Sequence, residues 1–306
     1  ETRYSALSYC WGDVKPPCLT TAGNHDKQFT KIDWEQVPQT FKEAIIFTRN
    51  LGLEYIWIDS MCIIQEGDGQ ADWNQECTRM FNYYSNAYIT LGALLARNCG
   101  EGLFSKEALR KQHLFDIMFR GCRSSVFAFR LVDEDWEFLH AHRGWFSRGW
   151  SLLRRGWAYQ ERLVAPRVLF FTKTQLIFDC FSCCTSEGKS FESPLSREDP
   201  NLKEQYGALL NGSSEHLTQT WQDIVQSYSG LQLTKPLDKL PAIAAIAQQV
   251  FSRQKCNDDS DTEYLCGLRK SHLHVDLLWE PEPFERTISR DREEAKYIAP
   301  SWSWAS

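Results

Sequence analysis

The stretch VPQTFKEAIIFTRNLGLEYIWIDSMCII (37–64) decides the fold, because its hydrophobic pattern changes at its middle. In residues 37–52, Pro38 opens a helix, apolar residues recur at helical spacing, and Gly52 closes it. Residues 53–64 form a nearly continuous apolar run, which predicts a strand covered on both faces. A helix that leads into a buried strand is the repeating unit of a parallel α/β sheet.

The same alternation continues on both sides of this stretch. The remaining expected segments are a strand at 4–9, a loop or irregular hairpin at 13–28, a helix at 72–87, a strand at 87–96, and a helix and strand between 154 and 171 that Pro166 separates. Residues 97–150 break the rhythm and are interpreted as an insertion. Strands that alternate with helices predict a parallel sheet with right-handed crossovers.

Beyond about residue 180 the signals weaken. We expect helices at 213–230 and 239–254, a mostly helical or mixed piece at 264–283, and an extended aromatic end, APSWSWAS. The predicted organisation is therefore an α/β sheet domain over residues 1–172, followed by a mixed, mostly helical C-terminal region over 173–306. That region packs on the core or follows it.

Composition excludes some classes of protein. Hydrophobic residues make up 42% of the 306 residues, enough for a sizeable core, and the formal net charge of -6 argues against a duplex nucleic-acid binder. No run is long and apolar enough to span a bilayer. The eleven Cys lack small-scaffold disulfide spacing, so we expect reduced thiols and a cytoplasmic protein. Residue 1 is Glu, so we expect the natural chain to begin further upstream.

Metal and cofactor motifs are incomplete. Cys180-x-x-Cys183-Cys184 is similar to half of a zinc site, and His272-x-His274 could supply the rest, but the spacing fits no standard pattern. We therefore predict no metal. No dinucleotide-binding GxGxxG, Walker or GxSxG pattern is present, so no bound redox cofactor is predicted either.

Ligands of an open parallel sheet bind at the carboxyl ends of its strands. This rule selects four places, which are Ser8 to Gly12 after the first strand, Asp59 and Ser60 in the second, Ala93 onward after the third, and the helix from Trp157 to Glu161. Asp59 interrupts an apolar run, where a carboxylate needs hydrogen bonds. It fits two interpretations equally, a cap on a neighbouring helix or turn and a functional group.

Glu161 follows Trp157 by one helical turn, so the two side chains share a face. An indole beside a partly buried carboxylate raises the pKa of that carboxylate. The simpler interpretation is a surface Glu paired with Arg154 or Arg162. The residues alone favour the simpler interpretation.

Three blocks of the chain, YSALSYCWG (4–12), the run from TFKEAII to ITLGA (40–93) and RGWAYQERLVAPRVLFF (155–171), resemble the fungal heterokaryon-incompatibility (HET) domain. They occur in the order of that family. Two later pieces, DKLPAIAAIA (238–247) and YIAPSWSWAS (297–306), are similar to segments on the C-terminal side of the domain in many such proteins.

The resemblance implies non-self recognition between fungal cells that ends in programmed cell death. The family is also distantly similar to the Toll/interleukin-1 receptor (TIR) fold, a flavodoxin-like parallel sheet, and some TIR domains cleave NAD at the nicotinamide–ribose bond. Their catalytic Glu lies on the helix after the third strand. That position corresponds to Glu161, so the resemblance reverses the preference for a surface Glu.

By the same resemblance NAD is a substrate, and several residues surround it. The resemblance implies that Glu161 is the catalytic carboxylate, and we expect Trp157 to stack on a flat ring. From their positions in the fold, we expect Ser8, Tyr9, Trp11 and Gly12 to line the opposite wall, and Asp59 and Ser60 the floor. The alternative is a non-catalytic module that self-associates or binds an unknown incompatibility or signalling partner.

Overall fold

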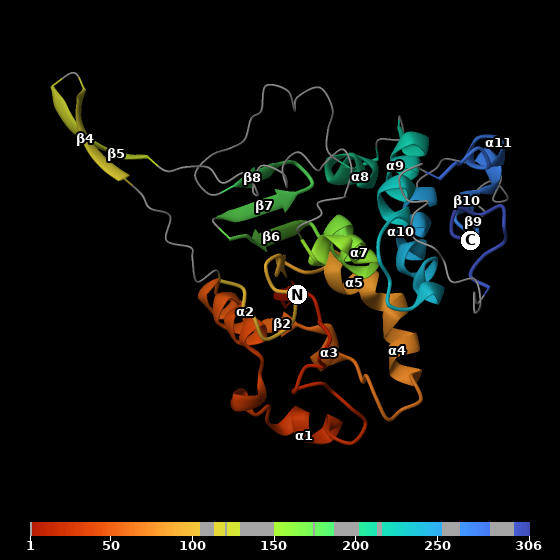
Figure 1. Cartoon of the computed structure of the whole chain (residues 1–306), viewed down its shortest axis with the longest axis horizontal. Coiled ribbons are helices and arrows are strands. Elements are labelled where there is room, and N and C mark those ends of the chain that lie inside the picture. The colour runs from red at the N-terminus through yellow and green to blue at the C-terminus, as the bar shows by residue number, and fades with distance from the viewer. Residues whose placement is uncertain are drawn as a thin grey trace.

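A central sheet of six strands organises the chain (Figure 1). The computed structural model describes residues 2–104, 113–119, 121–128, 150–173, 175–186, 202–212, 216–252, 264–281 and 297–306. The strands of the sheet, in spatial order, are β2 (Tyr55–Trp57), β1 (Tyr4–Ser8), β3 (Ile89–Gly92), β6 (Arg167–Phe171), β7 (Leu176–Cys180) and β8 (Cys184–Ser186).

The first four of these strands are parallel, and β7 and β8 add to the sheet as antiparallel strands. Numbered along the chain, the parallel strands have the order 2-1-3-4, which is the start of the order in flavodoxin-like sheets. The coarse prediction, an α/β fold with a mostly parallel sheet flanked by helices, is confirmed.

Helices connect the strands and cover the sheet. The described α-helices are α1 (His25–Thr30), α2 (Gln39–Asn50), α3 (Asp59–Cys62), α4 (Ala71–Glu76), α5 (Met80–Ser85), α7 (Gly156–Val164), α8 (Leu202–Leu210), α9 (Leu217–Ser229), α10 (Pro241–Phe251) and α11 (Leu273–Asp276). Short 3-10 turns are η1 (Trp34–Gln36), η2 (Cys77–Arg79), η4 (Leu152–Arg154), η5 (Pro236–Asp238) and η7 (Lys270–His272).

Separate hydrophobic clusters lie around the sheet. One joins α5 and α7 to the C-terminal helices α8, α9 and α10, with Tyr159, Trp221 and Ile243 buried at its centre. Another packs Phe41 and Ala44 of α2 against β1 and β3. The helices that follow β1 and β3 therefore contribute to different clusters, as expected for a doubly wound sheet.

The second predicted strand is much shorter than its apolar run. The predicted strand at 53–64 is wrong beyond Trp57, because the chain turns into α3 at Asp59. Its two-sided cover is also wrong, since β2 is an edge strand and Tyr55 is exposed. An apolar run indicates neither that every residue in it is buried nor whether a residue lies in a strand or in a helical turn.

Most other segments agree with the predictions. The helices α2, α9 and α10 and the pair formed by α7 and β6 lie where the periodicity places them, and α4 to α5 form the expected second helix with a 3-10 turn between them. The predicted loop at 13–28 is wrong at its end, because α1 begins at His25. The last residues form turns rather than an extended piece, and the indole of Trp304 donates to Gly267 O at 3.0 Å.

Segments outside the predicted sheet domain take part in its architecture. The sheet continues past residue 172 through β7 and β8. Within the predicted insertion, β4 (His113–Phe119) and β5 (Cys122–Ala128) form a separate hairpin that Figure 1 draws apart from the central sheet. The predicted mixed piece contains a two-stranded sheet of β9 (Tyr264–Leu265) and β10 (Leu268–Arg269), followed by α11.

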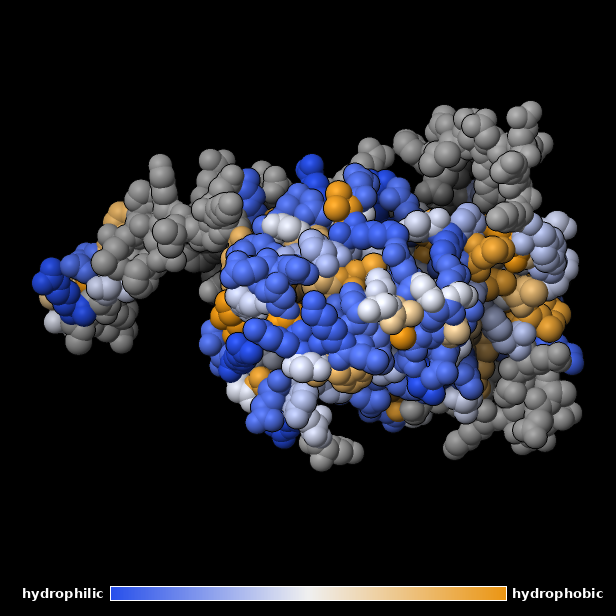
Figure 2. Space-filling model, turned by 90° about the horizontal axis from the view of Figure 1, so that it is seen from below, coloured by the Kyte–Doolittle hydropathy of each residue, from blue (hydrophilic) through white to orange (hydrophobic). Residues whose placement is uncertain are grey.

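Figure 2 shows a mainly hydrophilic face, with hydrophobic atoms gathered at the end of the molecule where α11 lies in Figure 1. Exposed Val275, Leu277 and Leu278 belong to this end. Among the helices that the structure describes, none has both the length and the apolar character needed to cross a membrane.

Candidate functional site

Two parallel strands end side by side where their following helices cover different faces. The register pairs Ser8, the last residue of β1, with Gly92, the last residue of β3. Crevices at such a switch point are the usual ligand sites of doubly wound sheets. The structure places Ser8, Tyr9 and Trp11 at this end of β1.

Glu161 of α7 lies against the same end of β1. Glu161 is only 8% exposed, and its carboxyl group makes hydrogen bonds with the side chains of Ser8 and Tyr84. Burial raises the pKa of Glu161 to about 7, and the negative charge of Asp59 acts in the same direction. The Ser8 hydrogen bond and the guanidinium of Arg155 oppose that shift without cancelling it. The carboxyl group is therefore poised to gain or lose a proton near neutral pH.

The interpretation of Glu161 as a surface residue paired with a neighbouring Arg is wrong. The residue is buried, and the Nε of Arg162 donates instead to Asp179 Oδ2 at 2.9 Å. Sequence spacing could not show this, because the packing of α7 between β1, α5 and α10 is set by distant parts of the chain.

Polar pairs join the end of β1 to α3. The Tyr9 hydroxyl donates to Ser60 Oγ at 2.7 Å, and the Trp11 indole donates to Asp59 Oδ2 at 3.0 Å. Burial raises the pKa of Asp59, and the Trp11 hydrogen bond counteracts that rise. Asp59 Oδ1 also accepts from Ser60 N at 2.6 Å. Asp59 thus holds the start of α3, as a cap would, and its charge also acts on Glu161, as that of a functional group would. The structure supports both interpretations of this residue.

Gly12 has a backbone role at the site. Its φ is +76°, a conformation that glycine adopts without strain. An added Cβ would lie 2.4 Å from Asn98 Cβ, so only glycine allows the loop after β1 to approach the loop after β3.

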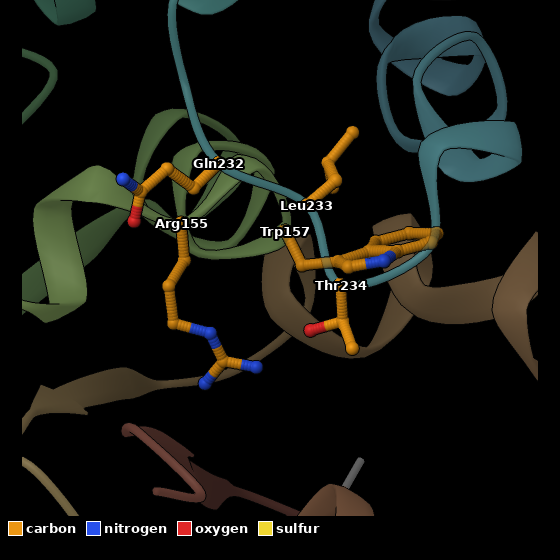
Figure 3. Close-up of a pocket in the computed structure, with 5 residues that line it drawn as sticks. All are labelled: Arg155, Trp157, Gln232, Leu233 and Thr234. Atoms are coloured by element: carbon orange, nitrogen blue, oxygen red, sulfur yellow. The ribbon is translucent and has the colours of Figure 1, made fainter. Parts of the chain in front are cut away.

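Trp157 lies at a cavity of about 290 Å³ that the loop at 232–234 forms with the start of α7. The other lining residues are Arg155, Gln232, Leu233 and Thr234. Figure 3 shows Arg155 extending downward from the start of α7, while the ring of Trp157 extends sideways beside Leu233 and Thr234 of this loop. The indole of Trp157 donates to Asp238 at 3.1 Å and its ring contacts Trp73 edge-on. Glu161 and Trp157 thus have different surroundings. Glu161 is hydrogen-bonded to Ser8 and Tyr84, whereas Trp157 lines the cavity.

Backbone hydrogen bonds hold the loop of the cavity onto the helix. Gly156 N donates to Gln232 O at 2.8 Å, and Gln232 N donates to Arg154 O at 2.7 Å. A Cβ on Gly156 would lie 2.7 Å from Leu233 Cδ2, so the close approach depends on glycine. The cavity is therefore built by the tight contact between α7 and the C-terminal region.

Sequence reasoning missed Arg155 and Tyr84. Arg155 donates to Tyr9 O, interacts electrostatically with both Glu161 and Asp59, and lines the cavity. The buried Tyr84 hydroxyl has one proton to donate, and both Leu7 O, at 3.1 Å, and the Glu161 carboxyl group lie within its reach. The only signal for Arg155 was its position at the start of the RGW block, and Tyr84 had none, since aromatic residues on α5 also fit a core.

The residues considered for a zinc site lie in separate parts of the fold. No group of three or more His, Cys, Asp or Glu residues arranged to hold a metal ion occurs among the described residues. His272, at the end of η7, stacks on His274 of α11, whereas Cys180 and Cys183 lie at the turn between β7 and β8. The two halves of the considered zinc site thus belong to different elements.

Comparisons with known proteins identify the family. The family model described as Heterokaryon incompatibility protein (HET) matches residues 4–161, which is more than half of the chain. The comparison with curated proteins gave no match, and neither did the comparison with solved structures. The matched range ends at Glu161, so it contains the candidate residues at the end of β1, on α3 and on α7, whereas residues 232–234 of the cavity lie beyond it. The chain therefore belongs to the heterokaryon incompatibility (HET) family, and this membership indicates a role in heterokaryon incompatibility.

Proposed function

We propose that this protein triggers programmed cell death during fungal non-self recognition by hydrolysing NAD at the bond between nicotinamide and ribose. The observation that carries the proposal is the Glu161 carboxyl group, which is buried at the end of β1 with a pKa of about 7. Carboxyl groups with raised pKa values in such crevices are frequent catalytic acids and bases.

The chemistry needs one carboxylate and one water molecule. As the C1′–N bond breaks, its electron pair moves to the nicotinamide nitrogen and positive charge develops on the ribose. Ionised Glu161 stabilises that charge, as carboxylates do in glycosidases. Water then adds to C1′ and loses a proton to Glu161, which leaves ADP-ribose and nicotinamide. A pKa near 7 lets the same group act as a carboxylate first and a proton acceptor afterwards.

Arg155 connects the carboxyl cluster to the cavity and gives the substrate an orientation. In this proposal its guanidinium attracts the diphosphate, and Trp157 stacks on the nicotinamide ring at the cavity wall. A volume of about 290 Å³ is at the lower end for small-molecule sites, so the cavity would hold one half of the dinucleotide. Ser8 orients Glu161 through its hydrogen bond. The neighbouring wall and floor of the site consist of Tyr9, Trp11, Gly12, Asp59 and Ser60.

The fold supports the proposal by analogy. A 2-1-3-4 order of parallel strands agrees with the flavodoxin-like architecture that the resemblance to TIR domains implies, and Glu161 lies on the helix that leads from the third parallel strand to the fourth. The proposal places the activity in the cytoplasm, where NAD is available as a substrate.

The decisive experiment follows nicotinamide release from NAD by the purified protein, both dilute and crowded. Glu161→Gln keeps the size of the side chain but removes its charge and replaces one acceptor oxygen with an amide donor. We expect turnover to fall by about 10²–10⁴-fold. Glu54→Gln, on the exposed segment before β2, is the matched control and keeps full turnover. Equal turnover in both variants would remove Glu161 from the mechanism.

A second candidate function is a non-catalytic interaction module. The observation that favours it is the apolar area at α11, where Leu278 is 77% exposed and Leu277 46%. Apolar surface of this kind often marks an interaction site. Leu278→Asp should then abolish self-association in sedimentation experiments and incompatibility signalling together, whatever the state of Glu161. Complete absence of NAD turnover in every assembled state would favour this candidate.

A further inference from the structure

Two cysteines close the turn between β7 and β8, at the edge of the sheet furthest from β2. The register pairs Asp179 with Cys184, so residues 180–183 form the turn. Cys180 N donates to Cys183 O at 2.9 Å, which holds the two ends of the turn together. The two Sγ atoms lie 3.7 Å apart.

We propose that Cys180 and Cys183 form a reversible dithiol–disulfide site that reacts with low-molecular-weight disulfides such as glutathione disulfide. A disulfide has an S–S distance of about 2.05 Å and needs its two Cα atoms within about 7 Å. A closed four-residue turn meets the second requirement. Rotation of the side chains can close the remaining gap between the sulfur atoms. This site is independent of NAD cleavage and goes beyond it.

Exposure and packing single out this pair among the three neighbouring cysteines. Cys183 is exposed and Cys180 is partly exposed. Cys184 instead packs against the hydrophobic cluster around Phe170 and Ile177, and burial raises the pKa of its thiol. Burial and the neighbouring Cys180 thiol raise the pKa of Cys183 as well, so the exposure of Cys183, and not its pKa, makes it the thiol that a dissolved disulfide reaches first, while the packing of Cys184 keeps it out of the exchange.

The turn is held in place from the side of α8. The Phe181 ring lies 6.2 Å from the Tyr206 ring, centroid to centroid. A Cβ on Gly207 would lie 2.6 Å from Phe181 Cβ, so the turn presses directly on this helix. Because Phe181 anchors the turn, the flanking cysteines keep their separation, and exchange requires little rearrangement of the backbone.

The exchange balances in two steps. The exposed Cys183, as the thiolate, attacks one sulfur of glutathione disulfide, whose S–S bond breaks and releases one glutathione that takes up the Cys183 proton. Cys180, as the thiolate, then attacks the Cys183 sulfur of the mixed disulfide. The Cys180–Cys183 bond forms, and the second glutathione leaves with the Cys180 proton. Two protein thiols are oxidised and one glutathione disulfide is reduced to two glutathione molecules.

The test equilibrates the whole chain in buffers with increasing ratios of oxidised to reduced glutathione, then blocks remaining thiols and maps the peptides by mass spectrometry. We expect an intramolecular Cys180–Cys183 link, a mass lower by two hydrogens, about 2 Da, and full reversal by excess reduced glutathione. Cys183→Ser should abolish the link, whereas Cys184→Ser should preserve it.

Some outcomes would overturn the site. These are reduced thiols at every ratio, a link that includes Cys184, a bond between two chains, and a link that survives Cys183→Ser. Because Cys183 is exposed, its replacement leaves the core intact, and unchanged thermal unfolding of the reduced variant confirms this. The peptide map is read without NAD, so its failure and failure of NAD cleavage are distinguishable.

Discussion

Glu161 and Arg162 are consecutive residues of α7, and both are buried, but the protein treats their charges in opposite ways. Arg162 has a direct partner, Asp179, whose side chain is fully buried at the other end of a 2.9 Å hydrogen bond. Lys203 completes this second cluster by donating to Arg162 O at 2.9 Å. The Glu161 carboxyl group instead lies near the hydroxyl groups of Ser8 and Tyr84 and the carboxylate of Asp59. The nearby guanidinium of Arg155 interacts with both Glu161 and Asp59.

The difference separates a structural charge from a reactive one. A buried ion pair with good geometry keeps both partners charged, and removing either partner is costly. A carboxyl group whose burial outweighs its stabilising contacts changes protonation near neutral pH. The same helix therefore supplies a fixed ion pair on one side of its axis and a titratable group on another.

The largest expected effect tests the structural half of the comparison. Asp179→Ala breaks the buried 2.9 Å ion pair with Arg162, so we expect the free energy of unfolding to fall by about 3–5 kcal/mol. Urea denaturation measures it. The double variant Arg162→Met with Asp179→Leu should recover most of the loss. A fall below about 1 kcal/mol would show that the pair stabilises the fold no more than a surface ion pair does.

The next effect is the pH dependence of stability. The pKa of Glu161 rises from an ordinary 4.5 when unfolded to about 7 when folded, so folding takes up a proton between these values. Its contribution is greatest below pH 4.5 and is lost as pH rises through 7. Between pH 5 and pH 8 the wild type should lose about 2–3 kcal/mol relative to Glu161→Gln, which cannot ionise. Urea unfolding across this range measures the difference, and parallel curves would contradict it.

A smaller effect concerns the group that links the cluster to the cavity. Arg155→Gln removes a positive charge that favours ionised Glu161, so the pKa of Glu161 should rise further. At pH 7 less carboxylate would be present, and nicotinamide release should fall by about 3–10-fold and recover at higher pH. An unchanged pH optimum with weaker NAD binding would instead limit Arg155 to substrate binding.

The smallest effect tests whether Trp157 belongs to the carboxyl cluster. Trp157→Phe keeps an aromatic ring but loses the hydrogen bond to Asp238, so we expect about 1 kcal/mol lower stability in urea. The midpoint of the pH dependence in the previous experiments should stay where it is. A displaced midpoint would mean that the indole tunes Glu161 directly.

Much of the fold could be predicted from the sequence, since helices α2, α9 and α10 have clear periodicity over ten or more residues. Errors arose in the short elements. The run at 53–64 is interrupted by Asp59 and Ser60, where the chain leaves β2 and turns into α3, and β8 has only 3 residues, too few to show a pattern. For the site, the strand-end rule selected Ser8 and Glu161, which the structure places next to one another, while their role in binding or catalysis stays a prediction.

The sequence by itself determined the alternation of helices and strands and the family, because periodicity, turn residues and motif blocks are local properties. Only the tertiary structure decided that Glu161 is buried beside Ser8, that Arg155 joins it to a cavity and that Arg162 pairs with Asp179. The physical reason is that burial and charge pairing depend on residues far apart in the chain. Residues 8 and 161, like 155 and 232, meet only after the sheet and the C-terminal region have packed.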